Sequence, residues 1–263
     1  SIYCQQNFPA HYFASLLSAQ PAGYYGPATL ANEARNRGIL MLPLDVNCSE
    51  ELFTVEDVKA TRDPKIILPS GGIRIGWMQV SGLSGGTRKR IVAQRDRPYD
   101  SFIDFVRRVR PSRDELEQLV LAGAFDRLQP HRRALLWAIP QALAEAQPGE
   151  KLDVTPEVDE TNLTDFNPVE KAIHERLVMG LDVDRHLMAF ERERIAAKQG
   201  LTTAEVRALP AGRRAIVVGN PIRLRFPPTP SGKRVVFFDL EDETGLLNVT
   251  CFDAVYRRDG QAI

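Results

Sequence analysis

The stretch VSGLSGGTRKRIV, residues 80–92, places a glycine-rich turn directly before a strongly basic helix start. The first amides of a helix have no partner inside the helix and carry partial positive charge, so they favour an anion. Glycines at 82, 85 and 86 let such an anion approach the backbone closely, and Arg88, Lys89 and Arg90 add long-range attraction. The stretch therefore predicts a phosphate-binding turn between two helices.

Two interpretations of this turn remain open from the turn alone. It is either a helix-hairpin-helix, which binds a DNA strand by its phosphates and reads no bases, or a solvated turn that only joins two helices. Nine basic and three acidic residues lie between Arg88 and Arg113. This charge excess favours the DNA-binding interpretation.

A second turn of the same kind follows in LEQLVLAGAFDRL, residues 116–128, and HRRALL, residues 131–136. One helix ends at Gly123, and the next begins with Arg132 and Arg133. Phe125 and Leu128 are expected to pack in the core. Two such hairpins predict a paired unit that straddles one duplex.

The flanking residues predict further local structure. Asn7 is expected to cap a helix with Pro9 in its first turn, a second helix is expected from Pro27 to Gly38, and residues 66–68 and 73–77 are expected to form a β-hairpin. Pro140 should bend or shorten the last helix of the hairpin region. The helices of that region are expected at residues 86–95, 101–109, 112–121 and 130–145.

The second half begins with an acidic, proline-containing linker at residues 147–168, followed by helices up to residue 209. Strands are expected at residues 215–219, 235–240 and 246–252, with six basic residues and no acid between Arg213 and Phe238. This arrangement predicts part of an OB-fold barrel that binds single strands. Phe237 either stacks on a base or packs against a neighbouring domain, while Val236, Phe238 and Leu240 should be core.

Composition excludes several classes of protein. Basic and acidic residues number 34 each, so the net charge is +0 and a wholesale polyanion binder is excluded. The three cysteines lie far apart, which argues against a disulfide framework and a cysteine zinc site. Asp182 and Asp184 are spaced like metal ligands, but a capping or linker role is favoured. No catalytic signature, signal peptide or membrane span is predicted.

Collinear motifs along the whole chain resemble the alpha subunit of bacterial DNA polymerase III, the C family of DNA polymerases. These motifs are residues 8–17, 38–47, 73–82, 122–133 and 240–245. Residues 20–27, residues 179–186 and the proline-rich loop at 227–232 favour the error-prone, damage-associated paralogue. Ser84 departs from the family, whose first hairpin has a second glycine there.

The resemblance implies a C-terminal fragment that is multidomain and mainly α with β. Its expected parts are the end of a fingers region with a small β element (1–78), a tandem helix-hairpin-helix domain (79–145), an acidic linker with a helical connector (146–211) and a partial OB domain (212–263). The parent would be a nucleotidyltransferase whose Mg²⁺-binding palm is missing from this chain. The chain itself is expected to have no cofactor and no catalytic residue.

The expected partners are primer–template duplex and single-stranded template DNA, a sliding clamp and accessory damage-response proteins, in the bacterial cytoplasm at the nucleoid and away from membranes. The alternatives are a stand-alone DNA-binding adaptor, a scaffold for repair proteins and, least favoured, a metal-dependent nuclease. The expected DNA-contacting residues are Ser81, Gly82, Leu83, Ser84, Gly85, Thr87, Arg88, Lys89, Arg90, Gly123, Arg132, Arg133, Arg223, Arg225, Lys233, Arg234 and Phe237.

Overall fold

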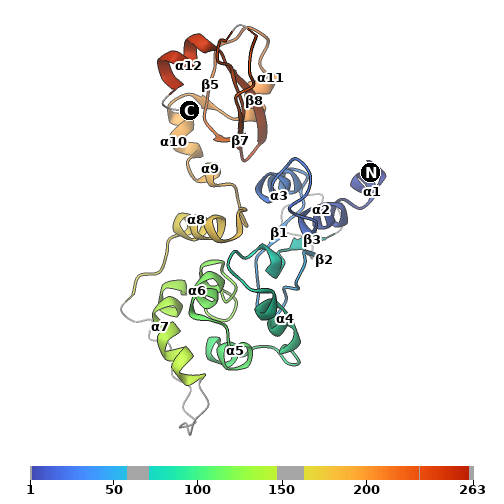
Figure 1. Ribbon diagram of the computed structural model, residues 1–263, viewed down its shortest axis with the longest axis vertical. Coiled ribbons are helices and arrows are strands. Elements are labelled where there is room, and N and C mark those ends of the chain that lie inside the picture. Colours follow the sequence, from blue (N-terminus) through green and yellow to red (C-terminus); the bar gives the residue numbers. More distant parts are fainter. Residues whose placement is uncertain (1, 58–70, 147–162, 231, 261–263) are drawn as a thin grey trace. The chain divides into compact units, whose positions relative to one another are not determined.

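The computed structural model describes residues 2–57, 71–146, 163–230 and 232–260 (Figure 1). The chain divides into two compact units, residues 1–184 and 185–263. Helices predominate in the first unit, whereas the second combines short helices and strands in similar proportion. The multidomain, mainly α architecture with β elements is therefore confirmed. In the described parts of the chain, every helix is too short or too polar to cross a bilayer.

The first unit opens with three helices and a small sheet. Helix α2 begins at Pro9, and its apolar residues Ala10, Phe13 and Leu17 are buried. The N-cap residue is Phe8, so the predicted Asn7 cap is wrong: Asn7 ends the preceding helix, and its side-chain amide donates to the Tyr3 carbonyl at 3.0 Å. The elements are α1 (Ile2–Asn7), α2 (Pro9–Ser18), α3 (Pro27–Asn36), β1 (Met41–Leu42), β2 (Thr54–Glu56), β3 (Gly72–Arg74) and the 3-10 helix η1 (Trp77–Gln79).

The sheet of this unit has β3 at its centre. Strand β1 pairs with β3 in parallel, and β2 pairs with it antiparallel. The predicted strand at 73–77 is shorter than expected because the chain turns into η1 at Trp77, whose indole Nε1 donates to the Ser49 carbonyl at 2.8 Å. The other predicted strand, residues 66–68, lies outside the described residues.

The described residues of the first unit form five further helices: α4 (Gly85–Ala93), α5 (Phe102–Val109), α6 (Arg113–Leu121), α7 (Arg132–Glu145) and α8 (Pro168–Met179). The first four confirm the helices predicted in the hairpin region. Helix α7 runs through Pro140 and is not shortened by it.

Phe125 is 1% exposed and packs edge-on against Phe102 and Phe105 at ring distances of 5.0 and 4.9 Å, which confirms it as a core residue. The predicted linker falls largely on residues 147–162, outside the described residues.

The second unit contains an antiparallel sheet in the order β6-β7-β8, with Leu240 of β7 opposite Leu247 of β8. The strand predicted at residues 215–219 is shorter than expected and is confined to β5, which pairs in parallel with β4. Strand β6, which pairs with β7, was not predicted. Helix α12 was not predicted. The elements are α9 (Leu187–Phe190), α10 (Arg192–Ala197), β4 (Gly200–Leu201), α11 (Thr203–Ala208), β5 (Ile216–Val217), β6 (Asn220–Arg225), β7 (Val236–Asp242), β8 (Gly245–Cys251) and α12 (Asp253–Asp259).

Candidate nucleic-acid interface

Ser84 caps the basic helix α4 at the first hairpin. Its hydroxyl oxygen accepts a hydrogen bond from the Thr87 amide at 3.2 Å, and the hydroxyl group donates to Thr87 Oγ1 at 3.1 Å. The hydroxyl is thus used inside the protein. Serine at this position stabilises the helix start, where the family's glycine would supply no side-chain cap.

The next two amides of α4 remain open. Among the described residues, neither the Gly85 amide nor the Gly86 amide has an intramolecular acceptor, and Gly86 is exposed. Two guanidinium groups lie beside them: a Cβ on Gly85 would lie 3.6 Å from Arg88 Nη2, and a Cβ on Gly86 would lie 3.5 Å from Arg90 Nη1. Open amides, the positive end of a helix and adjacent cations together favour a bound anion.

The hairpin is held in place by the buried carboxylate of Glu115. Its Oε1 accepts from the Ser84 amide at 3.0 Å, and its Oε2 accepts from the Ser112 amide at 2.9 Å, which completes a capping box on α6. Burial opposes ionisation, but these hydrogen bonds outweigh it and lower the pKa of Glu115 to about 2. Glu115 therefore connects the hairpin to the start of α6 as a carboxylate.

The lowered pKa makes the first unit sensitive to acid. The folded protein favours the ionised carboxylate of Glu115. Its contribution to the free energy of unfolding is therefore present above the ordinary pKa of 4.5 and is lost as the pH falls towards about 2. Glu115→Gln is expected to lower the free energy of unfolding at pH 7 by about 1–3 kcal/mol and to flatten the acid dependence. Urea denaturation followed by tryptophan fluorescence at pH 7, 4 and 3 measures both. Equal pH dependence in the two proteins would contradict this role.

The structure divides the nine basic residues between Arg88 and Arg113 into two groups. The first group is bonded to carboxylates and contributes little net charge: Arg95 to Glu50, Arg97 to Asp100 and Asp104, Arg107 to Glu145, Arg108 to Asp96 and Asp104, and Arg113 to Glu117. The second group has no carboxylate partner among the described residues and lies at or next to the hairpin: Arg88, Lys89, Arg90 and Arg110. Arg110 was not among the predicted DNA-contacting residues. Only its place beside Arg90 in the fold distinguishes it from the arginines that are paired with carboxylates.

The four cations differ in how firmly they are held. Arg90 donates from Nε to the Val109 carbonyl at 2.9 Å and from Nη2 to Thr87 Oγ1 at 2.8 Å, so it also fixes the end of α5. Lys89 is exposed, and no hydrogen bond or ion pair ties the Arg88 and Lys89 side chains to any residue that the structure describes. Leu83 is 6% exposed and its amide donates to the Val80 carbonyl at 3.4 Å, so its side chain and its amide are both engaged inside the protein.

The second hairpin is built differently, because Arg132 is buried. Its guanidinium bonds to Asp126 at 2.6 and 2.9 Å, to Glu175 at 2.6 Å and to the Leu121 carbonyl at 3.0 Å, and the residue is 3% exposed. A Cβ on Gly123 would collide with this guanidinium. The structure thus places Arg132 and Gly123 inside the protein, away from a position where they would meet a phosphate.

An internal carboxylate occupies the start of α7. Asp165 accepts from the Arg133 amide at 3.1 Å and pairs with Lys171 at 2.6 Å, and the His131 ring nitrogen Nδ1 caps the Ala134 amide at 3.0 Å. The Arg133 guanidinium lies over the Phe166 ring at 4.4 Å. Two of the amides that an external anion would use at this hairpin, those of Arg133 and Ala134, are therefore already bonded.

In the second unit, Phe237 lies on an exposed face of the sheet. It is 44% exposed, and its cross-strand partners are Arg225 on β6 and Thr250 on β8, both also exposed. Residues directly opposite each other share a face, so Arg225 and Phe237 lie together. Arg223 instead pairs with the buried Asp239 at an irregularity of β6. Lys233 and Arg234 lie exposed in the loop between β6 and β7.

Two acidic features of the sequence are structural. The Asp242 carboxylate in the motif at 240–245 is 0% exposed and accepts from the amide and hydroxyl of Thr203 at 2.8 and 2.7 Å. Asp182 is 2% exposed and pairs with Arg176 at 2.6 Å and Arg35 at 4.0 Å, whereas Asp184 is exposed. Asp182 and Asp184 do not converge, and in the described ranges no three His, Cys, Asp or Glu side chains gather as a metal site.

These hairpins define a helix-hairpin-helix region, and the family description "Helix-hairpin-helix motif" matches residues 38–135. Over 98–99% of its length the chain is similar to error-prone DNA polymerases: 41% identical to one from Symbiobacterium thermophilum, 31% to error-prone DNA polymerase 1 of Rhizobium meliloti and 27% to one from Rhodopirellula baltica. The chain covers 27%, 24% and 22% of these relatives, about a quarter of their length. The resemblance is confirmed, and the chain is a homologue of the error-prone DNA polymerases.

Proposed function

We propose that this chain is the DNA-holding portion of an error-prone DNA polymerase. In this proposal the first hairpin binds the phosphates of the primer–template duplex, and the exposed sheet face of the second unit guides the single-stranded template during synthesis across damage. The observation that carries the proposal is the pair of open amides at Gly85 and Gly86 beside the guanidinium groups of Arg88 and Arg90. Such a site contacts the backbone and is insensitive to base sequence.

The proposal divides the chain by role. Residues 1–78 are the end of a fingers region, 79–145 the helix-hairpin-helix domain, 146–211 a connector and 212–263 part of an OB domain. Nucleotide transfer would be carried out with Mg²⁺ in a palm that we place outside these 263 residues. A sliding clamp and damage-response proteins belong to the proposal as partners, and the bacterial nucleoid as its location, with no described residue assigned to them.

The site residues of the proposal are fewer than those expected from the sequence. In the first hairpin they are the backbone amides of Gly82, Gly85 and Gly86 with the side chains of Arg88, Lys89 and Arg90. The amides of Ser81, Leu83 and Ser84 are left out because they already donate to Val178, Val80 and Glu115. Thr87 is 1% exposed and acts by supporting Ser84 and Arg90. Arg132 and Gly123 are left out because they are buried, and Arg133 because its amide and guanidinium already have partners.

Fluorescence anisotropy with a primer–template junction, a blunt duplex and a single strand, across a salt series, tests the proposal. We expect binding to all three that is insensitive to sequence and weakens steeply with salt, because counterions are released from the phosphates. No binding to any of them at low salt would contradict the proposal.

One observation favours a second candidate, an interaction scaffold. Val169, Ile173 and Leu177 follow one face of α8 at the i, i+4, i+8 spacing and are 39%, 41% and 75% exposed. An exposed apolar stripe of this kind is typical of a protein-binding surface. Weak DNA binding with a flat salt response would favour this scaffold over the DNA-holding role.

A further inference from the structure

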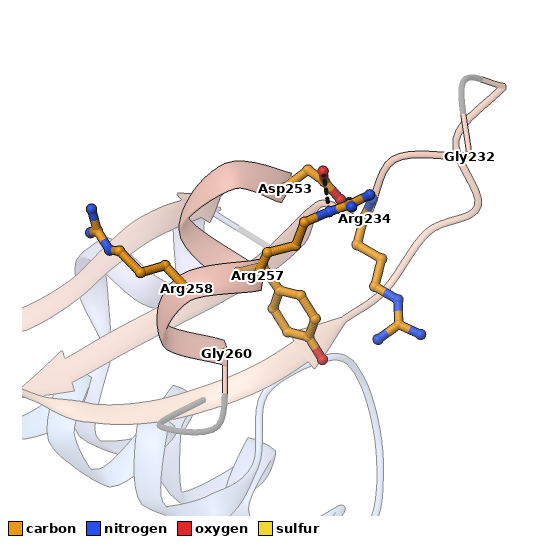
Figure 2. A pocket seen from close by; sticks show the side chains of 7 residues that line it. Gly232, Arg234, Asp253, Arg257, Arg258 and Gly260 are labelled. Atoms are coloured by element: carbon orange, nitrogen blue, oxygen red, sulfur yellow. Dashed lines mark hydrogen bonds and ion pairs between the residues drawn. The ribbon is translucent and has the colours of Figure 1, made fainter.

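An open cavity of about 690 Å³ lies between the β6–β7 loop and α12 in the second unit, and Arg234, Asp253, Tyr256 and Arg257 contribute to its wall (Figure 2). A second open cavity, of about 490 Å³, adjoins it and is bordered by Phe226 and Lys233. Gly232 and Arg234 line both cavities, so the two cavities adjoin at these residues. We call the two cavities together the loop–helix hollow.

Two aromatic rings meet at the hollow. The Phe226 and Tyr256 rings lie 6.3 Å apart at 76°, and Phe226 is 57% exposed. The Arg234 guanidinium lies over the Tyr256 ring at 5.6 Å. Phe226 thus presents an exposed ring and Tyr256 a partly buried one beside a cation, and such a surface binds the bases and phosphates of an unpaired strand.

The hollow has a net positive charge, because two of its basic side chains are neutralised by carboxylates and two are not. Arg257 pairs with Asp253 at 2.8 Å, and the same carboxylate accepts from the Arg234 amide at 2.9 Å. Arg258 points away from Arg234 (Figure 2) and pairs with Asp259 at 2.8 Å. The Arg234 guanidinium and the Lys233 ammonium have no carboxylate partner in the described part of the chain, so two cations are left for a ligand.

The chemistry identifies the ligand class. Stacking on an exposed ring requires a base that is free of its pairing partner, which excludes an intact duplex. The position also fits the path expected for a single strand: Phe226 follows Arg225, which lies opposite Phe237 on the sheet. We propose that the loop–helix hollow binds a nucleotide of single-stranded DNA, with its base against Phe226 and Tyr256 and its phosphate at Arg234 and Lys233. This inference rests on the proposed function and adds α12 to the template-binding surface.

Binding of a fluorescent oligothymidylate to the 263-residue chain tests the hollow, with a blunt duplex as the second ligand. Phe226→Ala and Tyr256→Ala are each expected to weaken single-strand binding by about 5- to 100-fold and to leave duplex binding unchanged. Tyr256→Phe keeps the ring and should bind like the wild type. Phe252→Ala is the matched control, because Phe252 is 65% exposed in the same unit but does not line the hollow. Circular dichroism verifies that each variant is folded.

Photocrosslinking with 5-iodouracil in the oligonucleotide locates the base directly, and we expect the crosslink at Phe226 or Tyr256. Wild-type single-strand affinity in both alanine variants, with the crosslink at Phe237 alone, would overturn the inference and leave the proposed function standing. A wild-type chain that binds duplex but no single strand would also overturn it, together with the template-guiding part of the proposal. Absence of binding to either DNA would contradict the proposed function as a whole.

Discussion

Arg132→Ala is expected to lower the free energy of unfolding of the first unit by about 3–5 kcal/mol. The substitution would leave the carboxylates of Asp126 and Glu175 without the buried cation that bonds to both at 2.6 Å. Burial raises the pKa of Glu175, and Arg132 opposes that shift. Since a small domain is stable by only about 5–15 kcal/mol, the loss would be a large part of the total.

Urea denaturation monitored by tryptophan fluorescence measures this loss, because Trp77 is 0% exposed within the same unit. Arg107→Ala is the matched control. Arg107 pairs with Glu145 at 3.4 Å on the surface, and its removal is expected to cost less than about 1 kcal/mol. Equal losses for Arg132→Ala and Arg107→Ala would show that the buried network does not stabilise the second hairpin.

Asp242→Ala is expected to destabilise the second unit by about 3–5 kcal/mol. The carboxylate accepts from Thr203 as described above and from the Thr244 amide and hydroxyl at 2.8 and 2.7 Å, and it pairs with Arg192 at 3.2 Å. Its removal would leave these donors buried and would detach α10 and α11 from the end of β7. Although burial raises the pKa of Asp242, the hydrogen bonds from Thr244 and Thr203 outweigh it and lower the pKa below 3.8.

Hydrogen exchange read by mass spectrometry over β7 and β8 measures this effect, because neither tryptophan lies in the second unit. The exchange of the variant should be faster throughout these strands at pH 7. In the wild type the stabilisation by the ionised Asp242 carboxylate is present above its ordinary pKa of 3.8 and is lost as the pH falls through its lowered pKa. Asp259→Ala, which removes an exposed ion pair with Arg258, is the control. Unchanged exchange in Asp242→Ala would exclude a structural role for the motif at 240–245.

Local sequence features predicted the hairpin region well. The starts of α4, α5 and α6 each have a serine whose side chain accepts a hydrogen bond from the third helical amide, and the apolar spacing of α5 buries Phe102, Phe105 and Val109. Capping and helical periodicity depend on residues only three or four positions apart. For that reason the ends of these helices could be predicted from the sequence to within about two residues.

The distribution of charge could not be predicted in this way. Arg132 and Arg133 are neighbours, yet one is buried against Glu175, which is 43 residues away in the sequence, and the other lies over Phe166. The same applies to Asp165, whose carboxylate takes the place of an external anion at the start of α7. Which arginine remains available to a ligand depends on such tertiary contacts, and these are not encoded in the spacing of basic residues.

Strand β4 was missed for a related reason. It has two residues that pair in parallel with β5, so it shows no alternating pattern of its own. Such a strand is defined by its partner and not by its own periodicity. Helix α12 was missed because it has only seven residues and no side-chain cap, and Asp253 in its first turn is a weak helix-start signal by itself.

The central claim is that one hairpin, the first, supplies the phosphate contacts to duplex DNA. The most direct test is the slope of log affinity against log salt concentration for a blunt duplex, measured for the wild type and for the double variant Arg88→Ala/Lys89→Ala. Each lost phosphate contact lowers the slope by about 0.9, so we predict a decrease of about 1.8. The double variant Arg107→Ala/Arg113→Ala removes the same charge from arginines already paired with Glu145 and Glu117, and its slope should stay close to the wild type. A wild-type slope in Arg88→Ala/Lys89→Ala would contradict the assignment of DNA binding to the first hairpin.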